Sequence, residues 1–312
     1  MYLKFWGVRG SLPTPLSPMQ IRSKIAAVIQ RITANDIKSV DAKERFLDSL
    51  PEWLTSTVGG NTACVQIRNN AGTDFILDAG TGIRLLGKKL ASEKKTVYHI
   101  FLSHYHWDHI QGLPFFDPIY NPASEFHFYI PENCTYEVLK EQMEQPCFPV
   151  SLDSCTKKMT FHNIDAGVPF EIDGTKINSC RMSHPGNSYA YSFEENGRKI
   201  IYATDVELQN RDYSDDYEDA EFFKNADILI LDAQYTVEEA FVKENWGHSP
   251  FSRAIDFAAK WNVKNLFLFH HDPTYDDKKI DSILQSARWY LDYIDRPDIK
   301  VFIAGENTDL TV

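Results

Sequence analysis

The amino-acid sequence predicts an α/β protein in which two β-sheets pack together and are covered by helices. Three observations lead to this prediction. Short β-rich runs bounded by turn residues fill most of the chain after residue 60, helical patterns alternate with strands only towards its end, and strict βαβ repetition is absent. Because the sequence contains neither an internal repeat nor a linker rich in Gly, Ser or Pro, we expect a single domain over residues 1–312.

The first part of the chain combines a strand with a helical segment. A predicted strand at 2–6 leads into a loop at 7–11, where two glycines permit unusual backbone angles. Residues 16–58 differ, because they lack glycine and their isoleucines recur at helical spacing between residues 21 and 32. This segment holds six basic and five acidic residues, so it is nearly neutral. We expect a two-helix insertion that acts as a cap, a lid or a dimer surface.

The rest of the chain predicts strands first and a mixture of strands and helices later. After Gly59-Gly60 we expect strands at 62–68, 73–77, 97–102, 125–130, 176–181, 189–193 and 199–203. Strands at 228–231, 265–269 and 301–304 are then interleaved with helices at 251–261 and 281–293.

The composition excludes several classes of protein. With 43% hydrophobic, 13% aromatic and 24% charged residues, the chain is neither collagen-like nor of low complexity. Its formal charge of −12 opposes bulk binding to nucleic acid or to an anionic membrane, so a local positive site must hold any anionic substrate. We find no apolar run near 18 residues and no export signal, and expect a cytoplasmic protein. Five cysteines without a C-x-x-C pair are expected to be reduced thiols.

The clearest chemical signal lies between residues 101 and 109. Three imidazoles and a carboxylate occur within six residues directly after an apolar strand: His104, His106, Asp108 and His109. Zinc and similar metals prefer neutral His nitrogens and carboxylate oxygens, and a tight turn at a strand end can direct several of them to one point. Four ligands in six residues cannot comfortably complete one tetrahedron, so two adjacent metals are favoured over one.

Further ligand candidates follow other predicted strands. His184, Asp205 and His270 each come after an apolar run that would place them at the rim of a sheet. Together they supply what a site for two metals still needs. Asp205 is suited to a bridging position because its carboxylate has two oxygens.

These motifs resemble the metallo-β-lactamase superfamily, whose H-x-H-x-D-H pattern is matched by residues 104–109. The resemblance extends in order over nearly the whole chain, from Gly7-Val8-Arg9-Gly10-Ser11 through Asp78-Ala79-Gly80-Thr81-Gly82 to His270-His271-Asp272-Pro273. Within the superfamily the chain is similar to the phosphodiesterase branch, which includes class II-like cyclic-nucleotide phosphodiesterases and ribonuclease Z. The resemblance implies a four-layer αβ/βα sandwich with metals at one edge of the two sheets.

The resemblance also implies roles for individual residues. One metal would take His104, His106 and His184, the other would take Asp108, His109 and His270, and Asp205 would bridge them. Asp78 would orient a ligand imidazole by a hydrogen bond, although a plain turn aspartate remains the alternative. Asp232 and His248 match the pair that acts as a proton donor in ribonuclease Z-like enzymes, with Asp where ribonuclease Z usually has Glu. The alternative for His248 is an incidental position beside a helix N-terminus.

We therefore expect a dinuclear metal-dependent hydrolase that cleaves a phosphodiester with metal-bound hydroxide. The cofactors would be two divalent ions about 3.5–4 Å apart, zinc first and manganese or iron as alternatives. A cyclic nucleotide is the first substrate hypothesis and RNA the second. The alternative is hydrolysis of a carbon ester, lactone or thioester on the same site. The partner would be a small phosphodiester or nucleotide, with no membrane and no bulk nucleic acid, and a homodimer is possible.

Three features remain open in the sequence. Residues 131–155 could form a lid or wall beside the metals, or ordinary surface packing. Arg9 could reach a phosphate or form a salt bridge, and His271 could face a phosphate or bond a carboxylate. His99, His127 and His162 lie in or beside strand patterns and are expected to be structural.

Overall fold

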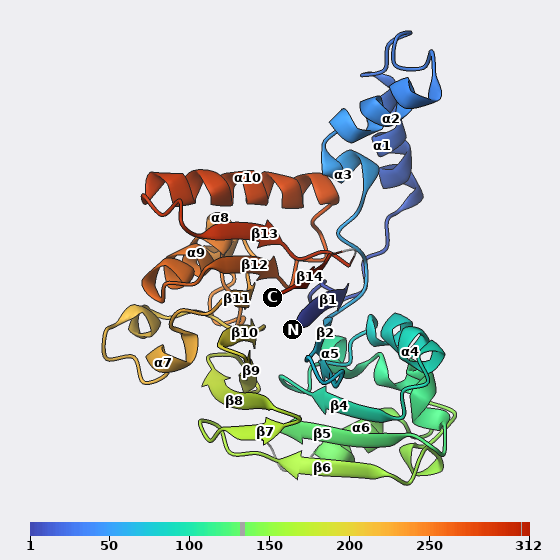
Figure 1. Cartoon of the computed structure of the whole chain (residues 1–312), viewed down its shortest axis with the longest axis vertical. Coiled ribbons are helices and arrows are strands. Elements are labelled where there is room, and N and C mark those ends of the chain that lie inside the picture. The colour runs from blue at the N-terminus through green and yellow to red at the C-terminus, as the bar shows by residue number, and fades with distance from the viewer. Residues whose placement is uncertain (132–134, 307) are drawn as a thin grey trace.

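Two mixed β-sheets form the centre of the molecule in a computed structural model that describes residues 1–131, 135–306 and 308–312 (Figure 1). The first sheet has the order β14-β1-β2-β3-β4-β5-β6 and the second the order β13-β12-β11-β10-β9-β8-β7. Strands of the first sheet are β1 (Tyr2–Gly7), β2 (Cys64–Arg68), β3 (Asp74–Leu77), β4 (Val97–Phe101), β5 (Glu125–Ile130), β6 (Met159–Asn163) and β14 (Asp309–Thr311). Strands of the second are β7 (Phe170–Ile172), β8 (Thr175–Met182), β9 (Ser188–Glu195), β10 (Arg198–Ala203), β11 (Ile228–Asp232), β12 (Asn265–Phe269) and β13 (Lys300–Ile303).

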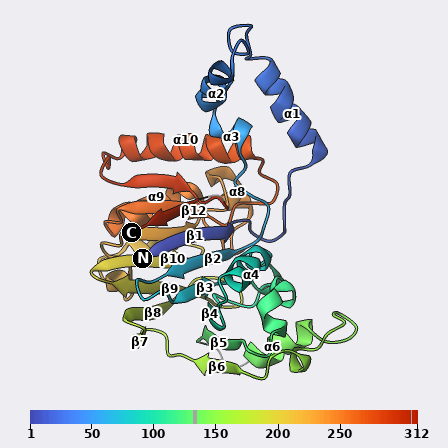
Figure 2. The same cartoon turned by 45° about the vertical axis from the view of Figure 1, so that its right-hand side comes forward.

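Helices cover the outer faces of both sheets, which gives the four layers that the sequence predicts (Figures 1 and 2). The α-helices outside residues 16–58 are α4 (Ile83–Ser92), α5 (Trp107–Ile110), α6 (Thr135–Gln142), α7 (Ala220–Phe223), α8 (Val237–Val242), α9 (Phe251–Lys260) and α10 (Asp277–Tyr293). Short 3₁₀ turns occur at η1 (Leu113–Phe115), η2 (Asp117–Tyr120), η3 (Leu152–Ser154) and η4 (Asn210–Tyr213). No helix among the described residues has both the length and the apolar character required to cross a bilayer.

Aromatic side chains fill the space between the two sheets. Phe5 on β1 packs against Phe267 on β12 with ring centroids 5.4 Å apart, and Phe75 on β3 packs against Phe193 on β9 at 5.2 Å. All four rings are buried. Burying apolar surface at about 25 cal/mol per Å² makes this layer the main stabilising contact between the sheets. A second buried cluster lies beneath α9 and α10 on the outer face of the second sheet.

Strand direction brings several loops to one edge of the sandwich. Strands β3 to β6 run parallel to one another, as do β10 to β13. Strand β8 has the same direction as β10, because each is antiparallel to β9. Ligands in such sheets bind beyond the carboxyl ends of strands. Residues that follow β3, β4, β8, β10, β11 and β12 therefore have a common place to meet.

Residues 16–58 contain α1 (Pro18–Ile29), α2 (Val40–Ser49) and the short α3 (Glu52–Thr55), one helix more than the two expected. A capping box between Ser17 and Gln20 begins α1, which contains no buried residue. Lys24 donates to the carboxylate of Asp277 at the start of α10 and to the carbonyl of Ser56. In both views α1 and α2 project away from the sandwich, beyond α10 (Figures 1 and 2).

Most predicted strands occur within two residues of their expected bounds, and three strands were not predicted. The additional strands are β6, β7 and β14, of which the last two have three residues each. Helix α10 begins at Asp277, four residues before its expected start, because Asp276 caps it by accepting from Lys279 N. The cysteines Cys64, Cys147, Cys155 and Cys180 are free thiols, and Cys134 lies outside the described residues.

Candidate metal centre

The seven ligand candidates lie at the edge where the two sheets bring their strand ends together. His104 and His106 follow β4, and Asp108 and His109 lie on α5 directly after them. The other three candidates follow strands of the second sheet: His184 after β8, Asp205 after β10 and His270 after β12. The apolar strands bury the backbone up to these points, so each polar side chain emerges at the rim rather than within the core.

One group contains His104, His106, His184 and Asp205. Each offers a ligand atom, and these atoms all lie within 4.8 Å of one another. His184 Nε2 is 3.2 Å from His106 Nδ1. Asp205 Oδ1 is 3.7 Å from His104 Nε2 and 3.8 Å from His184 Nε2. Three ring nitrogens and a carboxylate oxygen therefore surround one point, as four-coordinate metals require.

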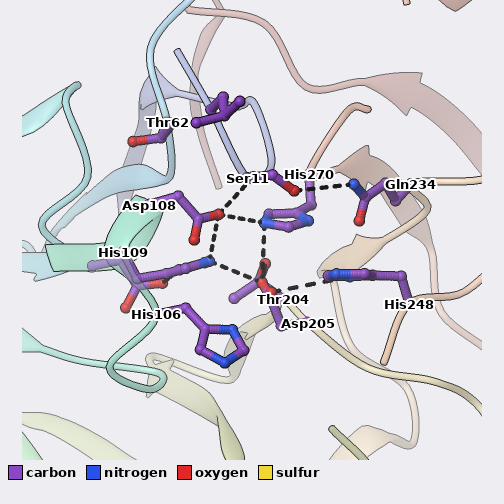
Figure 3. Close-up of polar contacts among 12 residues, drawn as sticks. Ser11, Thr62, His106, Asp108, His109, Thr204, Asp205, Gln234, His248 and His270 are labelled. Atoms are coloured by element: carbon purple, nitrogen blue, oxygen red, sulfur yellow. Dashed lines mark hydrogen bonds and ion pairs between the residues drawn. The ribbon is translucent and has the colours of Figure 1, made fainter. Parts of the chain in front are cut away.

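A second group contains Asp108, His109 and His270, whose ligand atoms also lie within 4.8 Å of one another. Asp108 Oδ2 is 3.2 Å from His109 Nε2 and 3.1 Å from His270 Nε2. The other oxygen of Asp205, Oδ2, is 3.1 Å from His109 Nε2 and 3.3 Å from His270 Nε2. Asp205 thus lies between the two groups and faces each with a different oxygen. Figure 3 shows its contacts with His109 and His270 of the second group.

Hydrogen bonds fix the orientation of two ligand imidazoles. His109 Nδ1 lies 2.7 Å from Asp78 Oδ2, and His184 Nδ1 lies 2.8 Å from the carbonyl oxygen of Gly247. Since these oxygens are acceptors, each Nδ1 carries the proton and donates it. The Nε2 lone pair of both rings is then directed into the site and is available to a metal.

Asp78 is the centre of a buried network behind His109. Its carboxylate accepts from Ser103 N at 2.7 Å, Ser103 Oγ at 2.8 Å and Tyr202 Oη at 2.6 Å, in addition to His109. Asp78 is fully buried and has a φ of 60°. A left-handed backbone costs energy for a residue other than glycine, so the surrounding contacts must maintain it. Ser103 and Tyr202 belong to this network, and neither was predicted from the sequence.

The donor set fits two divalent cations. Among the described residues, the buried site-facing nitrogens His104 Nε2 and His109 Nε2 have no hydrogen-bond partner. Unpaired buried polar atoms are costly, so two in one cluster indicate that a bound group completes their contacts. Burial also lowers the pKa of His104 well below its usual value, which keeps its ring neutral as a metal ligand must be.

His248 and Asp232 form a pair beside this cluster. His248 Nδ1 donates to Asp232 Oδ2 over 2.6 Å, and the carboxylate also accepts from Val206 N and Gln234 N. Burial acts to lower the pKa of His248, but the adjacent charge of Asp232 outweighs it and raises the pKa to about 9. His248 Nδ1 is 4.0 Å from Asp205 Oδ1, and its ring stacks on His270 at 4.9 Å. Figure 3 shows His248 facing Asp205 across from Asp108 and His109.

Glu207 holds the loop that precedes His248, a role that was not predicted from the sequence. Its carboxylate accepts from Asn245 N and from Gly247 N, each at a distance of 3.0 Å. Gly247 has a φ of +87°, and a Cβ built there would lie 2.2 Å from His184 Nδ1. Only glycine therefore allows this loop to approach the ligand imidazole while its carbonyl accepts from it.

The N-terminal loop supports the second ligand group. Ser11 N donates to Asp108 Oδ2 over 2.7 Å, which leaves the carboxylate oriented towards His109 and His270. A Cβ on Gly10 would lie 2.5 Å from the His270 ring, so this glycine permits close packing. The motif of residues 7–11 was visible in the sequence, but its contact with Asp108 was not.

Arg9 and His271 do not have the roles considered for them. The buried guanidinium of Arg9 donates to the carbonyls of Gly59, Asp272 and Tyr275, so it makes neither the phosphate contact nor the salt bridge. His271 is buried and its Nε2 donates to the carbonyl of Ala304 over 2.9 Å rather than to a carboxylate. Both side chains have a structural role, because each donates to backbone carbonyls that would otherwise be buried without a hydrogen-bond partner.

The other histidines form part of the first sheet. His99, His127 and His162 lie on β4, β5 and β6, and their rings stack in sequence with centroids 5.0 and 5.3 Å apart. His99 Nδ1 is 3.0 Å from Tyr129 Oη. This arrangement agrees with the structural role expected for them.

Residues 131–155, of which 132–134 lie outside the description, pack beside the ligand loop. Thr135 Oγ1 on α6 is 2.8 Å from Tyr105 Oη, and Gln142 Nε2 donates to the carbonyl of Ile110. These contacts put α6 against both ends of the 104–109 segment. A wall or lid function for this stretch remains a prediction.

The fold and the site together define a class of protein: an αβ/βα sandwich with clustered His and Asp ligands at the strand ends, as in metallohydrolases. The chain belongs to the metallo-β-lactamase superfamily, because residues 73–271 match the family described as "Beta-lactamase superfamily domain". Its curated relatives include ribonuclease Z, and its structural neighbours include human tRNase Z and yeast PDE1, which supports the phosphodiesterase branch that the sequence resembles.

Among curated relatives, ribonuclease Z of Oceanobacillus iheyensis is 26% identical over 267 residues, which cover 69% of this chain and 84% of the relative. Ribonuclease Z of Picrophilus torridus is 21% identical over 68% of this chain and 80% of its own length. These matches support a hydrolase of the metallo-β-lactamase fold.

Solved structures share the fold over the whole chain. The metallo-β-lactamase fold protein YhfI from Bacillus subtilis gives a TM-score of 0.65 at 15% identity and covers 99% of this chain and 98% of its own. A diphosphatase of the PhnP family gives 0.63 at 17% identity, with coverage of 100% and 97%. Human tRNase Z, short form, gives 0.60 at 18% identity, with coverage of 100% and 99%.

Proposed function

We propose that this protein is a metal-dependent phosphodiesterase. The observation that carries the proposal is the His248–Asp232 pair, 2.6 Å apart, beside two ligand groups that share Asp205. Cleavage of a phosphodiester expels an alkoxide, which needs a proton, whereas the ligand groups alone would serve many hydrolyses equally well. The proposal includes the roles of the seven ligands, of Asp78 as an orienting residue and of His248 with Asp232 as the proton donor.

In this proposal one set of residues binds the metals, and a second set, His248 and Asp232, transfers the proton. Two divalent metals held by the seven ligands would supply an activated water and neutralise phosphate charge. Asp78 holds His109 with its Nε2 directed at the metal, and Gly247 does the same for His184. His248 donates its proton to the leaving oxygen, and Asp232 keeps the ring oriented and stabilises its charged form.

The finer assignments are also part of the proposal. Zinc suits a set of five imidazoles and two carboxylates, with manganese or iron as alternatives. A cyclic nucleotide is the first substrate and RNA the second, because the net charge of −12 disfavours a long polyanion but not a small one held at the metals. We further propose a cytoplasmic location and a homodimer formed through the exposed isoleucines of α1.

The test compares leaving groups in a His248→Ala variant. With an alkyl phosphodiester, such as a cyclic nucleotide or a dinucleotide, the variant should lose about 10²–10⁴-fold in kcat, because the alkoxide must be protonated as it leaves. With bis(p-nitrophenyl) phosphate the loss should be much smaller, since nitrophenolate is a stable anion. Steady-state kinetics with zinc- or manganese-loaded enzyme measure both.

Two controls accompany this comparison. Metal content by elemental analysis should be unchanged in His248→Ala, and a His162→Ala variant on β6 should behave as wild type on both substrates. Equal losses on both substrates would contradict the proton-donor role. If the loaded enzyme cleaved no phosphodiester but hydrolysed a lactone, carbon ester or thioester, the alternative function would replace the proposal.

A further inference from the structure

Asp205 faces both groups of candidate ligands, and it does so with different oxygens. Its Oδ2 is 3.1 Å from His109 Nε2 and 3.3 Å from His270 Nε2. Its Oδ1 is 3.7 Å from His104 Nε2 and 3.8 Å from His184 Nε2. The χ2 torsion of an Asp side chain has broad minima, so a carboxylate turns easily about its Cβ–Cγ bond. A neighbouring group must therefore hold it in the orientation that serves both groups.

The hydroxyl of Thr204 supplies such a contact. Thr204 Oγ1 donates to Asp205 Oδ2 over 2.5 Å, and Figure 3 shows the two side chains next to each other. Thr204 is fully buried and Asp205 is 1% exposed, so water does not compete for this bond. A hydroxyl that donates to a charged carboxylate forms a bond about twice as strong as one between neutral groups. The bond fixes Oδ2, and with it the rotation of the whole carboxylate.

The hydroxyl also offsets a repulsion at Oδ2. His109 Nδ1 carries the ring proton, because it donates to Asp78 Oδ2, so His109 Nε2 has a lone pair. This lone pair and Asp205 Oδ2 are both acceptors and lie 3.1 Å apart. Two acceptors at this distance repel each other unless a cation lies between them. The donor on Thr204 stabilises Oδ2 in this place, so the carboxylate faces the second group before a metal binds.

The backbone on both sides of Asp205 holds Thr204 in place. Ser188 Oγ donates to the carbonyl of Thr204 over 3.2 Å, and Val206 N donates to Asp232 Oδ2 over 3.1 Å. Asp205 itself has a φ of 51°, a left-handed conformation that surrounding contacts must maintain. The β-branched side chain of Thr204 has few χ1 rotamers available. A rigid segment thus presents the hydroxyl, whether or not a metal is bound.

We propose that Thr204 is a positioning residue of the metal centre, which holds Asp205 Oδ2 as the fourth ligand of the second group. This inference rests on the proposed function for the roles of the seven ligands, and it adds to them a residue that touches no metal. The second group has three ligand residues of its own, whereas zinc in protein sites usually takes four ligands. An oxygen fixed towards this group therefore raises its affinity. The first group depends less on the bond, because Thr204 holds Oδ2 and not Oδ1.

A second effect of the hydroxyl acts in the opposite direction. A donor draws charge from Oδ2 and makes this oxygen a weaker ligand. The effect on orientation outweighs it, because loss of a hydrogen-bond partner behind a ligand typically lowers metal affinity by about 10- to 100-fold. Removal of the hydroxyl distinguishes the two effects, since they predict changes of opposite sign.

The test replaces the hydroxyl by a methyl group of similar size. Thr204→Val should lower the affinity for the second metal by about 10- to 100-fold and change the affinity for the first much less. Stepwise competition with a chromophoric chelator measures both affinities, and elemental analysis after dialysis measures the number of metals per chain. Thr204→Ser, which keeps the hydroxyl, should restore most of the affinity.

Two further backgrounds assign the loss to one ligand group. His106 belongs to the first group and His270 to the second, so His106→Ala and His270→Ala each impair a different site. Addition of Thr204→Val should weaken the remaining site strongly in the His106→Ala protein and only slightly in the His270→Ala protein.

Thr175→Val is the matched control. Thr175 is also fully buried, and its Oγ1 accepts from Asn69 Nδ2 over 3.1 Å at the opposite end of β8 from His184. Both metal affinities of this variant should equal those of the wild type. The metal-free melting temperatures of the two valine variants should be similar, which separates the loss of a positioned ligand from the loss of the fold.

Three results would overturn the positioning role: unchanged or higher affinity for the second metal in Thr204→Val, equal losses at both sites, or no recovery in Thr204→Ser. A wild type that binds no metal would overturn this inference together with the proposed function. If the second metal were lost in Thr204→Val but the loaded wild type cleaved no phosphodiester, the proposed phosphodiesterase would fail and the positioning role would stand.

Discussion

Asp78 accepts four hydrogen bonds, and one of them orients the imidazole of the candidate ligand His109. Ser103, His109 and Tyr202 supply the donors, and they lie 25, 31 and 124 positions from Asp78 in the sequence. Because every donor faces the carboxylate in a buried position, a side chain with amide hydrogens would create repulsion there. The position of His109 Nε2 therefore depends on the charge state and shape of one residue behind it.

We predict that Asp78→Asn weakens metal binding by about 10- to 100-fold, since loss of an orienting carboxylate typically has this effect. Competition with a chromophoric chelator measures the affinity. Asp74→Asn, on strand β3 directly before Asp78 but paired with Arg68, should leave the affinity unchanged. Wild-type affinity in Asp78→Asn would show that the carboxylate does not position His109.

The seven ligand candidates could be predicted from the sequence, whereas the residues that hold them could not. A cluster such as His104 to His109 is a local pattern, and His184, Asp205 and His270 follow recognisable strands. Glu207 and Tyr202 carry no comparable pattern, because an acceptor for two loop amides and a donor to Asp78 arise only when separate strands come together. These two roles depend on which residues are neighbours in the folded chain, and the spacing of residues in the sequence does not reveal those neighbours.

At the scale of elements, long and apolar strands were predictable and short edge strands were not. Strands β5 and β12 match their predicted bounds, since alternating or continuous apolar residues define them. Strands β7 and β14 have three residues each at or near sheet edges, where pairing with a neighbour rather than local propensity creates the strand. The projecting α1 was predictable as a helix, but its docking through Asp277 was not.

The histidine stack of β4, β5 and β6 leads to a prediction about pH. Burial lowers the pKa of His99 to about 4, with His127 and His162 adding to the effect and Asp173 and Glu125 opposing it. Below the ordinary pKa of about 6.5 the unfolded chain binds a proton that the folded chain refuses, so stability is complete above pH 6.5 and falls towards pH 4. After allowance for partial solvent exposure, the loss is about 1.5 kcal/mol.

A His99→Phe variant should remove this contribution and keep ring stacking. Urea unfolding at pH 7.5 and pH 5 measures the free energy of unfolding of both proteins. The histidines at the metal centre are present in both, so their contribution drops out when the pH-dependent loss of the variant is subtracted from that of the wild type. The wild type should lose more stability than the variant on acidification. A greater loss in the variant would mean that His99 is not neutral in the fold.

At the scale of the whole molecule, the two sheets are held by an apolar layer and by a polar edge that is incomplete without a bound group. Two candidate ligand nitrogens, His104 Nε2 and His109 Nε2, have no hydrogen-bond partner in the part of the chain that the structure describes, and Asp108 and Asp205 each have an oxygen within 3.2 Å of His109 Nε2. Cations there would relieve both deficits. Metal binding should therefore stabilise the entire fold rather than one loop.

We predict that removal of metal by a chelator lowers the melting temperature by about 10 °C. Metal at 1,000 times its dissociation constant adds about 4 kcal/mol, and each kcal/mol shifts the transition of a chain of this size by about 2–4 °C. Differential scanning calorimetry before and after chelation, and after return of zinc, measures the change. A His109→Ala variant should respond much less, and an unchanged melting temperature in the wild type would contradict a bound metal.

The division of ligands between the sheets has a consequence for how the chain acquires its chemistry. Four candidates come from the first sheet and three from the second, and the exposed turn at residues 164–169 joins the two halves. Neither half holds a complete coordination sphere, because Asp205 faces imidazoles from both. A nascent chain consequently has no hydrolytic centre until its later half has docked, which delays competence to the end of synthesis.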